Sequence, residues 1–468
     1  MNKLLFLCFV VAIFGLASCT TSPKIKVDVV LLNAQVVDVV SGHITPAQFI
    51  AIRGDSIAMV GPMNQNSDYR ATETTDVKNA YVMPGLWDNH VHFRGGDSLI
   101  HENQNMLPLF LAYGITTVRD AGGDISPAVM EWRKAITHNT LQGPTIFTSG
   151  PKLDGSQPAW AGSLHVENEE DITAALDALQ GLGVDYVKMY DGNLSATAFY
   201  AIITAAEKRG LKTTGHMPLS ADILKAVAMG LDGSEHLYYV LKACSSKADS
   251  LTALGIGYGM IASLIDTYDP NQAALVFKDL AKNNVYITPT LHIGSVLAHV
   301  LDVDHSKDTL LPYIGKGIQK TYEGRVSGAK RAREAGNNTR LRTETKFKEM
   351  VLPMYTAGVP LLAGSDCGAF NSFVYPGESL LQELKAMVDA GLSPKEALET
   401  SVINGPKFFG LENHYGQVAA NRKADLLVLT KNPLERIDHL NSLSYLIHQG
   451  KIRDKSALDI LLKEVGLD

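Results

Sequence analysis

The chain has 468 residues, of which 46% are hydrophobic and 19% charged, a composition that excludes a disordered or fibrous protein. At this length, one barrel-sized domain with a smaller partner fits better than three small domains. The formal net charge of −7 and the lack of a basic face argue against a nucleic-acid partner. The most basic stretch, 330–342, also contains Glu334 and is typical of a solvated helix face.

Residues 1–18 are predicted to be a lipoprotein signal peptide and are set aside from the fold. Lys3 precedes an apolar run, 4–14, that is too short to span a bilayer. The following Leu-Ala-Ser-Cys resembles the lipobox of bacterial lipoproteins, in which the cysteine, here Cys19, is lipidated. Residues 19–25 would form a lipid-anchored tether, and the protein would be exported and anchored to the bacterial cell envelope, on its periplasmic or surface face. Plain secretion with a free Cys19 is the alternative.

Cys244 and Cys367 are the cysteines that remain after the predicted lipidation site. They can pair in an oxidising compartment, although their separation in sequence gives no geometric support for a disulfide. Neither belongs to a CxxC-type arrangement, so we do not expect thiolate metal binding.

Short β-branched runs separated by turn residues occur at both ends of the chain. The runs are 27–32, 35–40, 48–52 and 56–60 near the N-terminus, and 424–429 and 443–447 near the C-terminus. Between these two sets of runs, the middle of the chain follows a different pattern of strand-like and helical segments. We therefore expect one small β-sandwich domain built from both termini, from residues 26–82 and from 406–468, which also include a C-terminal tail.

The middle of the chain, 83–405, alternates strand-like runs with helical patterns. The runs are 115–119, 145–148, 185–190, 212–215, 285–290 and 360–363. Ser195 and Gly210 flank a predicted helix, and Ser393 begins a capping box with proline at the first helical position. This α/β alternation indicates a parallel sheet, and eight units would close a (β/α)8 TIM-type barrel. The stretch 239–352 is too long for one unit and is predicted to carry an inserted helical segment.

Polar residues lie where the predicted strands end, which is where such barrels place their chemistry. They are His90, His92, Lys188, His216, His236 and Asp366. Alternate residues of a strand face the same side, so the HxH pair can offer two imidazoles to one ion. A lysine ending an apolar strand needs a partner or a shifted pKa, and a salt bridge to Asp185 or Asp191 is its structural alternative. Taken alone, each histidine is equally well explained as a buried core residue, and Asp366 as a helix cap.

Several segments of the chain resemble the amidohydrolase superfamily, and within it the imidazolonepropionase-like, prolidase-type branch. The segments are VMPGLWDNHVHF, GITTVRDAGG, GPTIFTSGP, VDYVKMYDG, KTTGHMP, SEHL, GVPLLAGSDCG and RKADLLVLTKNPL, which run from about Tyr81 to Pro433. The resemblance implies a metal-binding barrel with a β-sandwich made from both termini, in agreement with the pattern of elements.

The resemblance also implies two divalent metal ions. His90 and His92 would bind the first ion with Asp366, and His216 and His236 would bind the second. Lys188, carboxylated by carbon dioxide, would bridge the two ions. Zinc is expected from the histidine-rich set, although the same ligands accept manganese, cobalt or iron.

Two such ions would acidify a bridging water, so that hydroxide forms near neutral pH, and would polarise the scissile carbonyl. Asp366 is the predicted catalytic residue, because a metal-binding carboxylate lies within reach of that hydroxide and can pass its proton to the leaving nitrogen. We therefore predict a metal-dependent hydrolase that cleaves amide C–N bonds of small substrates such as dipeptides or N-acyl amino acids.

Three residues are candidates for substrate binding. Arg94 completes an HxHxR pattern and can hold a carboxylate through a bidentate contact, although a structural salt bridge explains it equally. Tyr238 can bind a carbonyl or carboxylate, or it can simply pack. The loop 154–160, followed by His165, lacks the glycine-rich, histidine-containing segment of many dipeptidase relatives, so Trp160 would line a different pocket. The pair Arg119–Asp120 is interpreted as structural.

Alternative functions stay open at this point. A cyclic-amide hydrolase of the hydantoinase or dihydroorotase kind would use the same ligands, and Arg94 favours it. A mononuclear deaminase is disfavoured by Lys188, because such members lack the bridging ligand. A non-catalytic binding lipoprotein is disfavoured by the presence of all six ligands. The expected partners are a small amide or peptide substrate and, through the lipid anchor, the membrane. A homo-oligomer is a further possibility.

Overall fold

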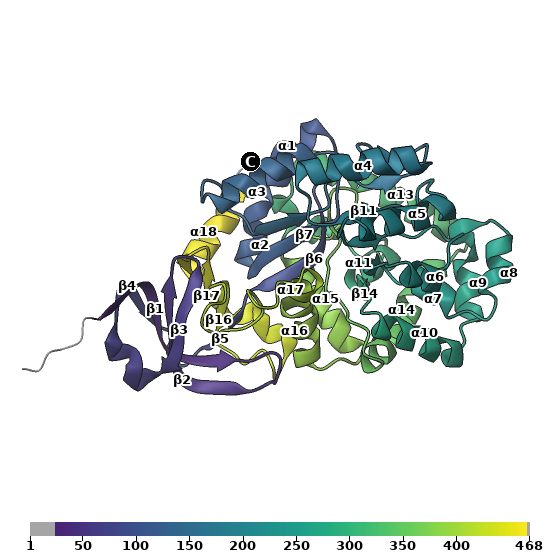
Figure 1. Ribbon diagram of the computed structural model, residues 1–468. Helices are drawn as coiled ribbons and strands as arrows, with labels where there is room; N and C mark the ends of the chain where they lie inside the picture. The colour runs from purple at the N-terminus through teal and green to yellow at the C-terminus, as the bar shows by residue number, and fades with distance from the viewer. Residues whose placement is uncertain (1–23, 466–468) are drawn as a thin grey trace, which may run out of the picture.

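The computed structural model describes residues 24–465, which form a sheet near the termini and a larger region of alternating strands and helices (Figure 1). The signal peptide predicted at 1–18 and the lipidation site at Cys19 lie outside the described residues. Within 24–465, no helix combines the length and apolar character needed to cross a membrane. Cys244 and Cys367 are both buried and free, so they do not form the disulfide that their number allowed.

The two β-rich ends of the chain join in one eight-stranded sheet. Its strands are β1 (Ile25–Val37), β2 (Ile44–Arg53), β3 (Ser56–Pro62), β4 (Tyr69–Asp76), β5 (Tyr81–Pro84), β16 (Leu426–Leu429), β17 (Leu443–His448) and β18 (Lys451–Asp454). Their order is β18-β17-β16-β5-β1-β2-β3, with β4 also paired to β1. The antiparallel pair β5–β16 joins the two ends, with Val82 opposite Val428. Both faces of β2 are covered, since Phe49 and Ile50 belong to different core clusters.

Strand β1 differs from the sequence-based expectation. The runs 27–32 and 35–40 were predicted as separate strands, broken at Asn33. They form a single strand in which Asn33 has a φ of 58° and the register with β2 shifts on both sides of Ala34. Asparagine tolerates the left-handed conformation, so this residue makes a bulge and does not end the strand.

The remaining strands are all parallel. One sheet has the order β15-β6-β7-β8, a second β10-β9-β11-β12, and a third pairs β13 with β14. Their bounds are β6 (Leu86–His92), β7 (Ile115–Asp120), β8 (Thr145–Thr148), β9 (Leu153–Asp154), β10 (Leu164–His165), β11 (Val187–Met189), β12 (Thr213–Gly215), β13 (Gly233–Glu235), β14 (Tyr286–Thr288) and β15 (Cys367–Gly368). The expected mixed α/β architecture with parallel sheets is therefore confirmed.

Backbone hydrogen bonds connect these three parallel sheets to one another. They run from Asp185 N to Thr148 O (2.9 Å), from Asp232 N to Thr213 O (3.2 Å), from Leu362 N to Ile287 O (2.8 Å) and from Asn89 N to Ala363 O (2.9 Å). The segment 360–363, which was predicted as a strand, takes part through such backbone bonds and an isolated bridge between Ile287 and Leu361. Strand ends that are distant in sequence are thereby held side by side.

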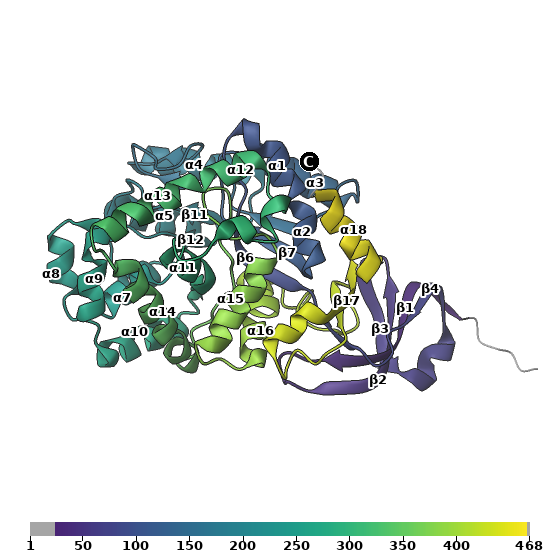
Figure 2. The ribbon, with the colours of Figure 1, turned by 180° about the vertical axis from the view of Figure 1, so that it is seen from behind.

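Helices surround the parallel strands (Figures 1 and 2). Their bounds are α1 (Ile100–Asn105), α2 (Leu107–Ala112), α3 (Ser126–Thr137), α4 (Glu169–Leu182), α5 (Ala196–Glu207), α6 (Ile223–Ala228), α7 (Tyr238–Ala243), α8 (Ala248–Ala253), α9 (Ile261–Asp266), α10 (Pro270–Lys282), α11 (Leu291–Ala298), α12 (Lys316–Thr321), α13 (Glu323–Glu334), α14 (Thr339–Thr356), α15 (Glu378–Asp389), α16 (Pro394–Val402), α17 (Asn404–Phe408) and α18 (Lys455–Val465). The expected extra helices lie on both sides of β14, as α7–α10 and α11–α14.

Two predicted helix starts are confirmed in detail. The Ser195 side chain accepts a hydrogen bond from Ala198 N at the start of α5, and Gly210 follows that helix with a φ of 68°. Ser393 and Glu396 form both bonds of the capping box at the start of α16. Because these signals depend only on residues three apart, they can be recognised without the tertiary structure.

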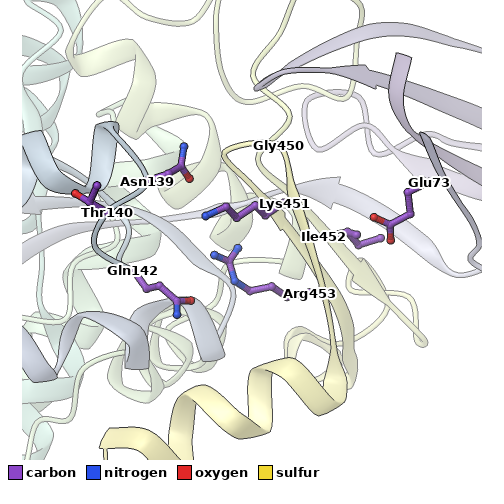
Figure 3. Close-up of a pocket in the computed structure, with 8 residues that line it drawn as sticks. All are labelled: Glu73, Asn139, Thr140, Gln142, Gly450, Lys451, Ile452 and Arg453. Carbon is purple, nitrogen blue, oxygen red and sulfur yellow. The ribbon is translucent and has the colours of Figure 1, made fainter. Parts of the chain in front are cut away.

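Gly85 is the point at which the chain passes from the terminal sheet to the parallel strands. A Cβ atom at this position would lie 2.2 Å from the Thr116 hydroxyl oxygen, so the close approach of the two segments requires glycine. Farther out, a surface hollow opens between the two regions and is lined by residues such as Glu73, Gln142 and Arg453 (Figure 3). None of the predicted site residues lines that hollow.

Candidate metal centre

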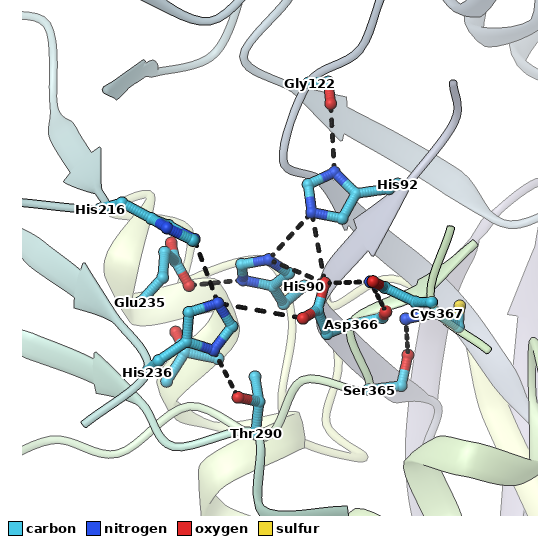
Figure 4. A network of polar contacts seen from close by, with 12 residues as sticks. His90, His92, Gly122, His216, Glu235, His236, Thr290, Ser365, Asp366 and Cys367 are labelled. Atoms are coloured by element: carbon cyan, nitrogen blue, oxygen red, sulfur yellow. Dashed lines mark hydrogen bonds and ion pairs between the residues drawn. The ribbon is translucent and has the colours of Figure 1, made fainter. Parts of the chain in front are cut away.

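The predicted ligands come together at the ends of the parallel strands. His90 and His92 lie at the end of β6, and Asp366 directly precedes β15, which pairs with it. His216 and His236 directly follow β12 and β13. Figure 4 shows the four imidazoles and the carboxylate facing one another.

The inner part of this centre consists of His90, His92 and Asp366. The two Nε2 atoms are 3.3 Å apart, and they lie 3.4 and 3.3 Å from Asp366 Oδ1. The three possible ligand atoms all lie within 4.8 Å of one another, which makes this group able to hold a metal ion. All three residues are buried.

The outer part consists of His216 and His236. Their Nε2 atoms are 3.1 Å apart, and that of His236 lies 3.9 Å from Asp366 Oδ2. Asp366 therefore faces the inner pair with one carboxylate oxygen and the outer pair with the other. Asn371 donates a hydrogen bond of 2.8 Å to Oδ1 and fixes the orientation of this carboxylate.

Each imidazole is held through its other ring nitrogen. The Nδ1 contacts are His90 to Glu235 Oε2 (2.6 Å), His92 to Gly122 O (3.1 Å), His216 to Asp191 Oδ1 (3.2 Å) and His236 to Thr290 Oγ1 (2.6 Å). A carbonyl or a carboxylate can only accept, so the first three histidines carry their proton on Nδ1. Their Nε2 lone pairs are left free and directed inward, which is how metal-binding imidazoles are usually oriented.

Charge and burial also suit metal binding. Burial is the largest cause of the lowered pKa of all four imidazoles, so each is neutral and able to coordinate at neutral pH. Burial by itself would raise the pKa of Asp366, but its neighbours His90 and His236 bring that pKa below the ordinary value. The centre thus combines neutral nitrogen ligands with an ionised carboxylate.

Lys188 is fully buried beside this centre. Its Nζ has no hydrogen-bond partner among residues 24–465 and lies 3.9 Å from Glu235 Oε1. Burial lowers the pKa of Lys188 to about 8. Neither acidic partner of the structural alternative is available, because Asp185 pairs with Arg133 and Asp191 with His216. A buried amine with a lowered pKa and no hydrogen-bond partner fits the carboxylated lysine that the family resemblance implied.

Sequence reasoning missed the role of Glu235. This buried carboxylate contacts His90 and accepts hydrogen bonds of 2.9 and 3.1 Å from Arg119 and one of 2.9 Å from Thr214. The expectation that Arg119 is structural agrees with this contact. The signal in the sequence was an acidic residue at the end of a strand, directly before His236, but nothing local identified its partner.

Three residues at the strand ends have left-handed backbones. His236, Thr290 and Asp366 have φ values of 62°, 51° and 56°. A non-glycine residue in this conformation costs on the order of 1 kcal/mol, and such residues cluster at functional sites. The fold thus holds two ligands and one of their supporting residues in strained positions.

The structure brings two of the three predicted substrate-binding residues together. The Arg94 guanidinium lies 4.2 Å from the centre of the Trp160 ring, and Arg94 Nε donates to Ala369 O. Tyr238 lies with its ring 6.4 Å from that of His236 and packs against Phe347. His165, by contrast, is exposed and pairs with Glu167, so it does not join the centre.

Comparisons with known proteins agree with this site. A model of the amidohydrolase family matches residues 81–453. An ochratoxinase from Aspergillus niger is 23% identical over 425 residues, which are 79% of this chain and 74% of that protein. An adenine deaminase from Ruegeria sp. (strain TM1040) is 24% identical over 287 residues, 59% of this chain and 46% of the deaminase, so the match spans less than half of that relative.

Solved structures share the fold. A bottromycin amidohydrolase has a TM-score of 0.73 at 20% identity, with 94% of this chain and 91% of that chain covered. A Xaa-Pro dipeptidase with methionine in its active site has a TM-score of 0.67 at 17% identity, with 91% and 99% covered. The prolidase-type resemblance seen in the sequence thus recurs among the structural neighbours. The family match covers most of the chain and includes every predicted ligand, and the chain therefore belongs to the amidohydrolase family.

Proposed function

We propose that this protein is a two-metal hydrolase of amide bonds in small substrates such as dipeptides or N-acyl amino acids. The observation that carries the proposal is the arrangement of four imidazoles, each held at Nδ1, in which Nε2 of His90, His92 and His236 faces Asp366 and Nε2 of His216 faces that of His236. Imidazole nitrogens that converge on one another and on a carboxylate, beside a buried lysine amine without a hydrogen-bond partner, are typical of a site that holds metal ions.

We further propose that the three parallel sheets together form the (β/α)8 barrel of the family, with the terminal sheet as its β-sandwich domain. The backbone bonds between successive sheets support this, because the last of them returns from Ala363 to Asn89 in β6. The candidate ligands then share the C-terminal end of one barrel, where the active sites of such barrels lie.

Asp366 with His90 and His92 would hold one ion, and His216 with His236 the other. Carboxylation of the Lys188 amine by carbon dioxide, with release of a proton, would supply an anionic ligand for both. When bound, divalent ions acidify water and polarise a carbonyl. The histidine-rich set favours zinc.

Asp366 would accept the proton of the attacking water and return it to the leaving nitrogen. Its lowered pKa keeps the carboxylate ionised and ready to accept. Asn371 would hold the carboxylate in one rotamer through the hydrogen bond to Oδ1. Within the described residues, the Tyr238 hydroxyl has no hydrogen-bond partner and would be free to bind the substrate carbonyl.

The test is metal analysis combined with assays on the purified protein. We expect two ions per chain and release of amine from dipeptides or N-acyl amino acids. Lys188→Ala should lose at least one of the two ions, and its activity should fall more than about 100-fold. This loss exceeds the roughly 10–100-fold typical of residues that only support a metal ligand. Added acetate should restore part of that activity, because it supplies the missing carboxylate.

The control variant is Lys278→Ala, at an exposed position of α10. Full metal content and activity in Lys188→Ala would disprove the two-metal proposal.

A cyclic-amide hydrolase is the second candidate. It is favoured by Arg94, whose terminal nitrogens have no acceptor among residues 24–465 and can hold a substrate carboxylate. Adenine deamination is a third, since adenine deaminases are among the relatives. Assays with hydantoins, dihydroorotate and adenine beside the linear amides separate these reactions. Activity on one class alone identifies the reaction.

We also propose that the protein is exported and anchored to the cell envelope through Cys19. The support is the lipobox-like sequence at residues 16–19. Labelling of cells with radioactive palmitate should mark the wild-type protein and not Cys19→Ala. Equal labelling of both would contradict the anchor. Retention of unlabelled wild-type protein in the soluble fraction would indicate plain secretion.

A further inference from the structure

Lys152 is a buried cation that the proposed mechanism does not use. It lies between β8 and β9, and only 2% of its surface is exposed. Its Nζ has no hydrogen-bond partner and, among residues 24–465, no carboxylate within ion-pair distance. Burial lowers the pKa of Lys152 well below its ordinary value, because an ammonium without a partner is unfavourable in the interior. An anion bound beside this amine would favour its charged form.

Lys152 and Arg94 share the same aromatic surroundings. Lys152 Nζ lies 5.1 Å from the centre of the Trp160 ring and 5.3 Å from that of Tyr190. The Arg94 guanidinium lies over Trp160 at 4.2 Å and 5.6 Å from the Phe370 ring. Aromatic faces attract cations, but they neutralise no charge. Two basic side chains therefore share one indole ring, and after burial the Arg94 charge is the next cause of the lowered pKa of Lys152.

This pair of cations adjoins the metal centre through two glycines. Gly122 O holds His92 Nδ1, and a Cβ on Gly122 would lie 3.2 Å from Lys152 Cγ. A Cβ on the next residue, Gly123, would lie 2.8 Å from Arg94 Cβ. The stems of both cations thus pass beside the backbone that positions a metal-binding histidine.

The nearest acidic groups are already occupied. Asp120 accepts hydrogen bonds from the Thr148 hydroxyl and from Phe93 N, and Asp124 accepts one from Gly95 N. Asp366 faces the histidines. None of these carboxylates accepts a hydrogen bond from Lys152 Nζ or from the terminal nitrogens of Arg94, which leaves both groups able to bind an anion from outside the chain.

We propose that Arg94 and Lys152 bind a carboxylate group of the substrate beside Trp160. The planar fork of an arginine can bind both carboxylate oxygens, and a lysine adds a compact charge. This inference rests on the proposed function and narrows its substrates to amides that carry a free carboxylate. An N-acyl amino acid or a dipeptide would meet this requirement, and the corresponding carboxamide would not.

Binding measurements on the metal-loaded protein test the proposal without requiring turnover. The probes are 3-phenylpropanoate and 3-phenylpropanamide, which differ only in the terminal group and lack the N-acyl amide that the proposed reaction would cleave. By titration calorimetry at low salt, the wild type should bind the acid at least tenfold more tightly than the amide. Lys152→Met should lose most of this preference and leave the affinity for the amide unchanged.

Two further readouts separate binding from folding. Lys152→Met removes a buried amine that has no hydrogen-bond partner and keeps a similar volume, so its melting temperature should equal or exceed that of the wild type, with metal content unchanged. Lys278→Met, the same substitution at an exposed site, should keep the preference for the acid.

The proposal is overturned if the wild type does not prefer the acid, including the case in which neither probe binds. It is also overturned if Lys152→Met retains the preference. Failure of hydrolysis with this binding pattern intact would contradict the proposed reaction alone.

Discussion

The two parts of the metal centre are supported in different ways. The inner pair, His90 and His92, is nearly inaccessible, with 0% and 6% of the side chains exposed. The outer pair, His216 and His236, is 14% and 12% exposed. Behind His90 stands Glu235, which also binds Arg119, whereas His236 rests on the single hydroxyl of Thr290.

This difference indicates how each part depends on the rest of the fold. Glu235 and Arg119 join several strands through one buried set of charges, since Arg119 also donates to Asn89 O and to the Thr288 hydroxyl. The outer pair is supported by Thr290 and Asp191, and among residues 24–465 neither of these pairs with a buried arginine. A change behind the inner pair should therefore affect folding and metal binding together, and a change behind the outer pair should affect metal binding alone.

The largest effect is expected for Glu235→Gln. Loss of this charge leaves Arg119 buried without its partner, which costs about 3–5 kcal/mol when a buried ion pair is broken. We expect a lower melting temperature and loss of metal, measured by calorimetry and by elemental analysis. Glu207→Gln, at an exposed position of α5, is the control. A variant with unchanged melting temperature would contradict the coupling of the inner part to the fold.

A smaller effect is expected for Asp191→Asn. Asp191 accepts from His216 and from the hydroxyls of Tyr239 (3.0 Å) and Tyr258 (2.6 Å). The amide is a weaker acceptor for His216, so metal affinity should fall by about 10–100-fold with little change in melting temperature. Competition with a chromogenic chelator measures this. Asp177→Asn, on the exposed face of α4, should behave as wild type, and a large loss of stability in Asp191→Asn would break the distinction between the two parts.

The smallest effect is expected for Thr290→Val, which removes one hydroxyl and keeps the volume. The His236 ring loses its only Nδ1 partner among the described residues. We expect a reduction in metal affinity near tenfold, the lower limit for such supporting contacts. Thr252→Val, whose hydroxyl bonds its own helix, is the control. An effect of Thr290→Val larger than that of Glu235→Gln would reverse the proposed ranking.

Much of the fold could be predicted because its signals are local. The runs at 115–119 and 145–148 form β7 and β8 within one residue of the expected bounds, since an apolar, β-branched run between turns has few alternatives. The run at 360–363 forms only an isolated bridge, because its pairing depends on neighbours that the sequence pattern cannot identify. The sequence pattern also predicted that the two ends of the chain form one domain, but it did not predict the order of the strands in their shared sheet.

The sequence by itself determined the set of candidate ligands, because residue type and position at a strand end are properties of a short segment. Only the tertiary structure decided what surrounds those ligands. His90 and Glu235 touch although 145 residues separate them, and Glu235 meets Arg119 across 116 residues. The same holds for Lys152, whose burial beside Arg94 and Trp160 follows from packing between separate loops. The cost of burying a charge depends on its whole surroundings, and those exist only once the chain has folded.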